Sequence, residues 1–565
     1  MERRVIIFLV LSLIIVAGYD YLLKQLGIVP SATEEAARQV DSSEKPSSTM
    51  EGQPAGPPAT GSGAETKATG SEARTGDISP GGHESSAEQI VTIETDLLKV
   101  ELTNKGGVIK TWQLKRYSTE TQTGPQPVQL VYRGGQFPGP LSLRVSDEAA
   151  TREMQQALYR VEETGLRLDP GHPTGRVTFT YRNPKSGLAI QKTLGFRHDS
   201  YLVDVEVKTE GVQGPVNVGM GTNFGIIEWG EGFIGLIGPA SMVDDKIEKE
   251  TPEQEAERSG TVQWAALQDK YFLSVIIPSQ GTAVQVKKES ERVVSSQVKV
   301  APPAGQPVKL QLYAGPKEYD TLRSFQIGLE DTIDFGWFIY GSWSLVKMVA
   351  KPLFSVLRTI NEVTHNYGVT IILLTVCIKL LFAPLQYKSY KSMKDMQVIQ
   401  PKVLALQEKY KDDRERLNKE LIKLYRDHKV NPVGGCLPMV LQMPVFVALF
   451  NILYMTIDLR QAPFFLWIKD LSVPDPFYVL PVIMGATMVL QQKMTPTTLD
   501  PTQAKVMLIL PVMLTFLFLT FPAGLVLYWV TNNTLTIVQQ FVTDRFIFKR
   551  PGPDKTAAAE AATQA

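Results

Sequence analysis

Residues Thr370–Gln386 read TIILLTVCIKLLFAPLQ, an apolar stretch that carries one charged side chain, Lys379. With the residues just before it, the stretch predicts a membrane-spanning helix over Tyr367–Gln386, because about 20 mainly apolar residues cross the hydrocarbon core of a bilayer. A charge within a span costs roughly 2.5–3.5 kcal/mol on insertion scales, so it needs a partner, water or an escape to the interface. Lys379 is therefore the first candidate for a functional residue.

Four further apolar stretches predict later spans, over Gly435–Thr456, Phe477–Gln491, Val506–Phe521 and Gly524–Thr543. The second and third of these give helices of only about 22–24 Å, against roughly 30 Å of hydrocarbon. We expect them to be shielded by protein or to lie in a locally thinned bilayer. The five spans contain neither Asp nor Glu, so their sequence offers Lys379 no ion pair.

Near its start the chain carries Arg3 and Arg4 and then an apolar run, Val5–Leu23. We predict that residues 1–29 form an uncleaved N-terminal transmembrane anchor, the first of six spans, because the run continues past the small residues that a peptidase requires. A cleaved signal peptide is the alternative, since Val16–Gly18 supplies such small residues.

The distribution of basic residues orients the spans. Segment 387–430 carries 12 Lys or Arg, whereas loop 457–476 carries two. Short basic loops stay in the cytoplasm, so we expect the first segment inside, the second outside, and both termini, with the short tail 549–565, in the cytoplasm. The whole chain balances 58 Lys and Arg against 58 Asp and Glu, which argues against a specific nucleic acid partner.

Two segments without a spanning pattern follow the first anchor. Residues 30–88 contain no aromatic residue and few large aliphatic ones, so they cannot bury enough apolar surface to fold and are predicted to form a disordered linker. Over residues 89–322 the apolar period becomes two, for example at Val203, Val205 and Val207. Such alternation predicts the half-buried strands of a large external antiparallel β-sandwich.

Residues 323–365 are predicted to form the junction to the membrane region, with an amphipathic helix over Gly336–Lys351. Its aromatic residues lie near its start: Trp337, Phe338, Tyr340 and Trp343. Such rings favour the headgroup layer, so the helix is expected to lie on the outer membrane surface and to end at Pro352. The alternative is a helix that caps the β-domain.

Polar side chains form stripes on two of the predicted spans. Thr375, Lys379 and Gln386 fall within about 40° of one another on a helical wheel. In the last span the corresponding residues are Tyr528, Asn532, Thr536 and Gln539, and other spans add Gln442 and Gln491. Polar stripes that faced lipid would lack partners, so we expect them to face one another across a wet cavity. Interhelical hydrogen bonds in a dry bundle, or a Lys379 that snorkels about 10 Å to the interface, are the alternatives.

Within the predicted core, residues 366–548, segment 387–430 reads as a cytoplasmic helical hairpin. Its apolar residues have helical spacing, and Asp412 and Asp413 provide a break and an N-cap between the arms. The hairpin is either a solvated helix pair or a basic docking surface for something that arrives from the cytoplasm.

The sequence lacks the motifs of common enzyme classes. There is no GxxxxGK phosphate loop, no GxSxG nucleophile elbow and no HExxH. The two cysteines, Cys377 and Cys436, fall in or beside apolar runs, which excludes a disulfide framework. We therefore expect no enzymatic activity, catalytic residue, cofactor or metal.

Three stretches resemble the YidC/Oxa-type membrane protein insertases in their six-span Gram-negative form. They are NPVGGCLPMVLQMPVFVALF at Asn431–Phe450, LRQAPFFLWIKDLSVPDPFYVLP at Leu459–Pro481 and FPAGLVLYWVTNN at Phe521–Asn533. DFGWF at Asp334, KPLF at Lys351 and YAGPK at Tyr313 are similar to the junction sequences of that family. The resemblance covers nearly the whole length.

The resemblance implies an α-helical polytopic protein of the inner membrane with a large periplasmic β-supersandwich of no catalytic role. It implies an insertase and chaperone whose five-span core encloses a hydrophilic groove open to cytoplasm and lipid. In such a groove Lys379 takes the place of the family's usual Arg, without that residue's bidentate fork. The implied partners are nascent membrane proteins, which contact the third and fifth spans, the Sec translocon, membrane lipids, and the ribosome or signal recognition pathway at the hairpin.

Two other functions fit parts of the pattern. A transporter could use Lys379 in a solute pathway, although we find neither internal repeats nor broken helices at the midplane. A carbohydrate-binding β-domain could merely be anchored by the helices.

Overall fold

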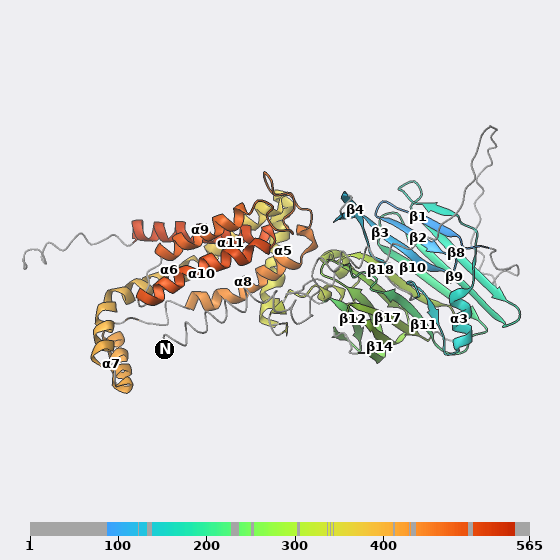
Figure 1. Ribbon diagram of the computed structural model, residues 1–565, viewed down its shortest axis with the longest axis horizontal. Coiled ribbons are helices and arrows are strands. Elements are labelled where there is room, and N and C mark those ends of the chain that lie inside the picture. The colour runs from blue at the N-terminus through green and yellow to red at the C-terminus, as the bar shows by residue number, and fades with distance from the viewer. Residues whose placement is uncertain are drawn as a thin grey trace, which may run out of the picture. The chain divides into compact units, whose positions relative to one another are not determined.

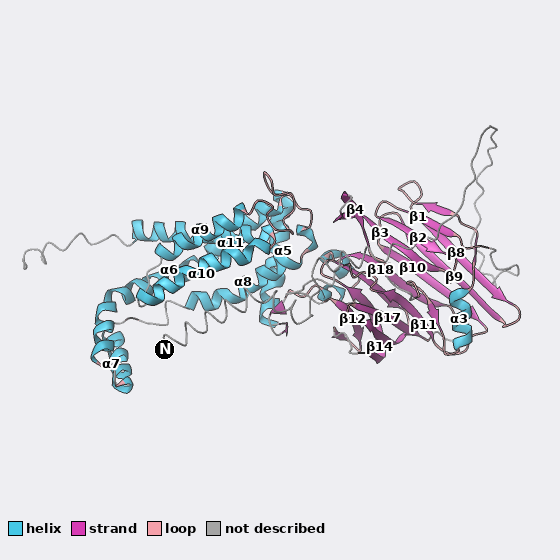
Figure 2. Ribbon diagram, in the orientation of Figure 1, coloured by secondary structure: helices cyan, strands magenta, loops and turns pink. Residues whose placement is uncertain are grey.

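The computed structural model describes residues 87–121, 124–132, 138–227, 237–249, 254–301, 306–335, 337–338, 341–342, 344–410, 413–428, 430, 437–494 and 501–547. The predicted anchor 1–29, nearly all of linker 30–88 and the tail 549–565 lie outside these residues. Tyr340 and Trp343 also lie outside them, as do the side chains of Trp337 and Phe338. Figure 2 shows the strands in one region of the chain and most helices in another.

The strand-rich region extends from Ile90 to Pro316 (Figure 1). Its strands are β1 Ile90–Glu94, β2 Leu98–Thr103, β3 Val108–Thr121, β4 Gly124–Gln129, β5 Leu143–Arg144, β6 Arg160–Val161, β7 Gly165–Arg167, β8 Thr174–Asn183, β9 Leu188–Arg197, β10 Leu202–Glu210, β11 Val216–Thr222, β12 Gly238–Val243, β13 Lys246–Glu248, β14 Glu255–Gln268, β15 Phe272–Pro278, β16 Gly281–Ser290, β17 Val293–Val300 and β18 Val308–Pro316. Helix α3, Glu148–Gln156, interrupts them.

These strands form two sheets. The smaller has the order β4-β3-β2-β1-β7, and the larger runs β5-β11-β17-β16-β14-β15-β18-β10-β9-β8-β6, with β12 and β13 branching from β14. Neighbours are antiparallel except for the pair of β1 and β7. In β10 the residues Val203, Val205 and Val207 are buried while Asp204 is exposed, so the predicted alternation is confirmed.

The two sheets pack on a shared hydrophobic core. Trp112 of β3 is fully buried, and its indole Nε1 donates to the carbonyl of Ala314 in β18 at 2.9 Å. Its ring meets the ring of Phe224 edge to face at 5.9 Å. A bond from one sheet to the backbone of the other fixes their separation, so the region is a sandwich with a closed core.

The helical region follows a short junction. The junction contains α4 Tyr319–Ser324, η1 Leu329–Thr332, β19 Trp337–Phe338 and β20 Gly341–Ser342. The helices are α5 Ser344–Thr364, α6 Tyr367–Lys409, α7 Arg414–Asp427, α8 Leu437–Met455, η2 Ile457–Leu459, α9 Val479–Met494, α10 Pro501–Leu517, η3 Phe518–Thr520, α11 Ala523–Val542 and η4 Thr543–Ile547.

Helix α11 packs against α9 and α6, α5 packs against α8 and α6, and α10 packs against α9. Among the described residues, only α6 is both long and apolar enough to cross a membrane by length and composition. Two shorter apolar helical stretches, Gln442–Met455 and Ile509–Thr520, accompany it. The five predicted later spans thus correspond to one long helix, α6, and to the shorter helices α8, α9, α10 and α11.

The predicted bounds of the helix over Gly336–Lys351 are wrong, although its second half, from Ser344, is helical. Trp337–Phe338 and Gly341–Ser342 pair as a two-stranded hairpin, and α5 begins only at Ser344 and continues through Pro352 to Thr364. Val346, Ala350, Phe354 and Leu357 are buried at helical spacing, so packing of this face holds the helix together across the proline. The first arm of the predicted hairpin is likewise a continuation of α6, whose helix contains Pro384 and Pro401.

Candidate functional site

A cavity of about 530 Å³ lies among the helices. It is lined by Gln386, Tyr387, Ser389, Tyr390, Met393, Gln442, Met443, Phe446, Gln491, Tyr528, Trp529, Asn532, Thr536, Gln539, Gln540 and Thr543. We call this the polar cavity. Most of its polar groups are neutral amides and hydroxyls, which can hydrogen-bond to water or to a peptide without demanding a counter-ion.

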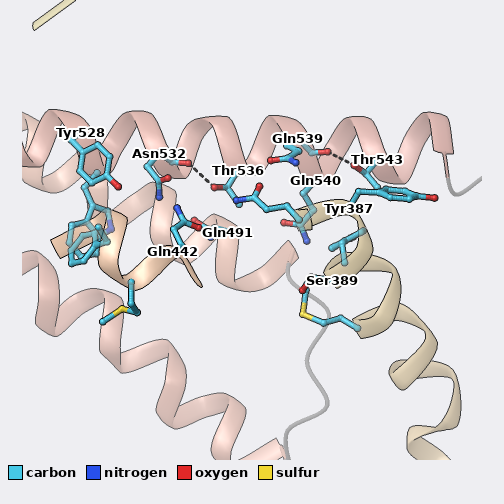
Figure 3. Close-up of a pocket in the computed structure, with 16 residues that line it drawn as sticks. Tyr387, Ser389, Gln442, Gln491, Tyr528, Asn532, Thr536, Gln539, Gln540 and Thr543 are labelled. Carbon is cyan, nitrogen blue, oxygen red and sulfur yellow. Dashed lines mark hydrogen bonds between the residues drawn. The ribbon is translucent and has the colours of Figure 1, made fainter. Parts of the chain in front are cut away.

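The polar stripe of α11 forms one wall of the cavity. Tyr528, Asn532, Thr536, Gln539 and Thr543 follow one another along this helix (Figure 3). Their offsets of three or four residues place them on one helical face. The hydroxyls of Thr536 and Thr543 donate to the carbonyls of Asn532 and Gln539, at 2.7 Å each. These bonds fix the rotamers of the two threonines and leave the amides to face the cavity.

The remaining predicted lining residues come from three other helices. Gln386 belongs to α6, Gln442 to α8 and Gln491 to α9, and all three line the cavity. Residues from four helices therefore meet at one site, and Figure 3 shows Gln442 and Gln491 beside α11.

Lys379 lies one hydrogen bond away from this lining. Its Nζ donates to the hydroxyl of Thr536 at 2.7 Å, and its side chain is buried, with 8% of the residue exposed. Among the described residues no carboxylate lies within ion-pair distance of this ammonium. The amine therefore reaches across to α11 and does not extend along α6 toward the helix end.

Thr375 does not line the cavity. Its hydroxyl donates to the carbonyl of Ile371 at 2.6 Å, within its own helix, and the residue is buried. Such a back-bond satisfies the hydroxyl without any outside partner, so this threonine needs no polar surroundings.

Sequence reasoning missed the end of the cavity toward η4. Gln540 lies off the predicted stripe, and its Nε2 donates to the carbonyl of Met494 at the end of α9, at 2.7 Å. Tyr390 donates its hydroxyl to Asp544 at 2.6 Å, and Lys394 pairs with the same carboxylate. Only the high density of polar residues after Gln539 signalled this end in advance.

Within the described ranges no group of three or more His, Cys, Asp or Glu residues could hold a metal ion. The β-region carries a second, more polar hollow of about 740 Å³ beside α3, lined by residues of both charges such as Arg144, Glu255 and Lys299.

Two family models match the chain. One is described as the YidC periplasmic domain and covers residues 90–356, and the other as a 60Kd inner membrane protein and covers residues 359–550. A relative named membrane protein insertase YidC, from Syntrophus aciditrophicus (strain SB), is 40% identical over 478 residues, which are 81% of this chain and 85% of that protein.

A second relative of that name, from Geotalea daltonii, is 36% identical over 556 residues, which are 96% of this chain and 98% of that protein. A crystal structure described as an active YidC insertase with its first transmembrane domain resolved is 20% identical, covers 81% of this chain and 95% of its own, and has a TM-score of 0.33. The chain therefore belongs to the family of YidC membrane protein insertases, inner-membrane proteins that carry a periplasmic domain.

Proposed function

We propose that this protein inserts nascent membrane proteins from the cytoplasm into the inner membrane through the polar cavity, without nucleotide hydrolysis. The observation that carries the proposal is the hydrogen bond between Lys379 and Thr536, which holds a cation with no carboxylate partner in the described chain against the cavity lining. An ammonium held in this way attracts acidic or polar groups of an incoming chain.

The polarity of the bundle supports this role. Large apolar side chains are exposed on its helices, among them Leu380, Leu381, Val482, Val512, Phe516 and Phe541. These side chains suit contact with lipid, whereas the amides line the interior. A substrate can thus place its polar end in the cavity while its apolar segment moves into the bilayer beside α8 and α10.

The driving force in this proposal is the burial of the substrate's apolar segment. At roughly 25 cal/mol per Å² of apolar surface, a segment of about 20 residues gains many kcal/mol on entering the lipid. That gain exceeds the cost of passing a few polar groups through a hydrated half-channel, so no hydrolysis step is required.

The proposed setting is an inner-membrane protein of six spans with both termini in the cytoplasm. The hairpin formed by the end of α6 and by α7 receives substrates from the ribosome or the signal recognition pathway. Asp413 caps α7, accepting from the amide of Arg416 at 3.0 Å, so the second arm of the hairpin has a defined start. The protein acts as an insertase and chaperone, alone or beside the Sec translocon.

The experiment replaces Lys379 in the full chain, reconstituted in vesicles, and measures insertion of single-spanning substrates with acidic external tails. We expect Lys379→Glu to impair insertion about tenfold or more, because a carboxylate repels the acidic tail. Lys379→Arg keeps the positive charge and should insert normally. Lys379→Ala separates charge from hydration, since it removes the ammonium and leaves the amides in place.

Thr536→Val is the matched control. It removes the acceptor of Lys379 and keeps the shape of the side chain, so it should weaken insertion less than Lys379→Glu does. Equal insertion by the wild type and by the Glu and Arg variants would refute the electrostatic role of Lys379. Solute flux through the same vesicles, without peptide insertion, would instead identify a transporter.

A further inference from the structure

The loop between η2 and α9, residues 460–478, exposes large apolar side chains at the protein surface. Leu466 is 86% exposed and Phe477 is 67% exposed, and their neighbours Phe465 and Tyr478 are more than half exposed. Exposed apolar groups of this size on a loop are unusual and mark a contact surface.

The exposure does not result from a loosely held loop. The amide of Phe464 donates to the carbonyl of Ile468 at 3.0 Å, and the amide of Ile468 donates to Phe465 at 3.2 Å, which closes a tight turn around Leu466. Asp475 is buried and accepts from the indole of Trp467 at 2.9 Å and from the amide of Leu480 at 2.8 Å. The two apolar pairs, Phe465–Leu466 and Phe477–Tyr478, are therefore held in fixed positions.

Two of these side chains occupy backbone conformations that disfavour them. Leu466 and Tyr478 each have φ of +57°, in the left-handed region where Gly and Asn are preferred. A bulky residue there costs on the order of 1 kcal/mol, and at Leu466, which is 86% exposed, little burial offsets this cost. Neither the turn geometry nor burial therefore accounts for a leucine at position 466.

The exposed surface continues onto α9. The amide of Val482 donates to the carbonyl of Tyr478 at 3.2 Å, so Val482 lies one helical turn beyond Tyr478, and it is also exposed. Ile483 and Leu490 extend the exposed apolar surface along the same helix. Because the exposed apolar surface of the loop is continuous with that of α9, a bilayer that contacts α9 also reaches the loop.

The charges of the loop are consistent with a headgroup setting. The guanidinium of Arg460 lies over the ring of Phe272 at 5.5 Å. The half-buried carboxylate of Asp470 accepts from the hydroxyl and the amide of Ser472, at 2.7 and 2.8 Å, so it is held within the loop. Lys469 is exposed and lies between the two apolar pairs in the sequence. Its long side chain can keep the ammonium in the polar layer while the apolar groups go deeper.

We propose that Phe465, Leu466, Phe477 and Tyr478 form a rigid wedge that inserts into the outer leaflet of the membrane, at the boundary of headgroups and acyl chains. The inference rests on the proposed function only for the side of the membrane on which the loop lies. The wedge contacts the lipid surface itself, and not a second copy of the chain or another protein.

The test measures the depth of a nitroxide label on the full chain in vesicles of phosphatidylcholine and phosphatidylglycerol. Cys377 and Cys436 are replaced by Ser, and the label is attached at Leu466→Cys. We expect collisions with oxygen to exceed collisions with a water-soluble nickel chelate, as for a site below the headgroups. A label at Glu162→Cys, on the exposed surface of the β-region, should show the opposite order.

A second variant keeps the result independent of folding. Leu466→Asn suits the left-handed backbone, so it should not lower thermal stability, while a label at Phe477→Cys becomes at least about twofold more accessible to nickel. Equal nickel access at Leu466 and Glu162 in vesicles of the purified protein would overturn the proposal. If access at Leu466 then fell only after another protein was added, the occupant would be that protein and the proposal would also be overturned. The depth measurement involves no substrate, so its failure is distinct from a failure of insertion in the Lys379 experiment.

Discussion

Two buried lysines without a carboxylate partner in the described chain show two ways of satisfying an ammonium. Lys192, in β9, is fully buried and donates to the carbonyls of Gly106, Gly107 and Leu141 at 3.2, 2.8 and 2.8 Å. Its three donors are all used within the β-sandwich. Lys379 has one protein acceptor, Thr536, beside a polar cavity. The first lysine is a closed structural element, whereas the second retains donors for water or substrate.

Lys192 makes the stability of the β-domain depend on pH. Burial lowers the pKa of Lys192 to about 7, from an ordinary value of 10.5. Between these two values the unfolded chain binds more protons than the folded one, so this lysine makes the free energy of unfolding increase as the pH rises from about 7 to about 10.5. We expect Lys192→Met to remove this increase.

The same substitution leaves three buried carbonyls without their donor, so it should also lower the free energy of unfolding by about 1–3 kcal/mol at pH 7. Denaturant unfolding of residues 88–335, at several pH values from 7 to 10, measures both effects as the difference between wild type and variant. Lys105→Met, at an exposed position, serves as the control. A difference that stays constant with pH would contradict the expected titration.

The sequence predicted which residues line the polar cavity better than it predicted the hydrogen bonds that these residues and their neighbours form. Gln386, Gln442 and Gln491 lie at the cavity because polar groups within apolar helices have few other places to go. Thr375 failed as a prediction because a threonine can satisfy its hydroxyl within its own helix. The bond of Lys379 to Thr536 depends on the rotation of α6 against α11, which periodicity within one helix does not specify.

At the scale of elements, α9 and α10 approach closely at Gly485. A Cβ added to Gly485 would lie 2.1 Å from the hydroxyl oxygen of Thr515, which is itself held by a 2.7 Å bond to the carbonyl of Pro511. We expect Gly485→Ala to lower stability by about 1–3 kcal/mol, because the helices must separate or Thr515 must give up its bond. Thermal unfolding of the protein in detergent measures the loss.

Thr515→Ala provides the test of that mechanism. It removes the clashing oxygen, and the next contact of the new Cβ, with the Cβ of Thr515, would be 3.3 Å. The double variant should therefore recover most of the stability lost in Gly485→Ala. If the two losses simply add, the close approach of the helices at this point is not the cause.

The sequence placed the strands well and the helix ends poorly, for physical reasons. Alternation in β10 or β18 follows directly from burial of one face of a sheet. Pro352 suggested a helix end, yet α5 continues past it because tertiary packing outweighs one lost hydrogen bond. The aromatic residues before α5 suggested a helix, although Trp337–Phe338 pairs with Gly341–Ser342 as a hairpin.

At the scale of the whole molecule, the β-region and the helical region have opposite distributions of polarity. The sandwich buries its apolar side chains and a few satisfied polar groups, whereas the helices expose apolar side chains and enclose amides. The first distribution suits water, as for a periplasmic domain, and the second suits contact with lipid. We therefore expect the helical region to carry the insertion activity.

Asp334 and Phe335, in the junction between the two regions, contact the helices directly. The side-chain amide of Asn451 in α8 is buried and donates to the carbonyl of Phe335 at 2.7 Å. The ring of Phe335 packs on that of Phe354 in α5 at 5.0 Å. Lys347 of α5 pairs with Asp334 at 3.6 Å. Removal of residues 334–335 would take away the carbonyl to which the buried Asn451 amide donates and one of the rings packed on Phe354.

Two deletions that differ only in their C-terminal end test this division. Removal of residues 90–320 takes away the sandwich and keeps Asp334 and Phe335, so we expect insertion of single-spanning substrates in vesicles to remain within about threefold of the wild type. Removal of residues 90–343 also takes away the junction, and with it the Phe335 carbonyl and ring that contact α8 and α5, and should cost several-fold more insertion and lower the thermal stability of the helices. Complete loss of insertion with the shorter deletion would show that the periplasmic domain performs an essential part of the function, as an anchored carbohydrate-binding protein would require. Equal activity of the two deletions would show that the contacts of Phe335 do not support the bundle.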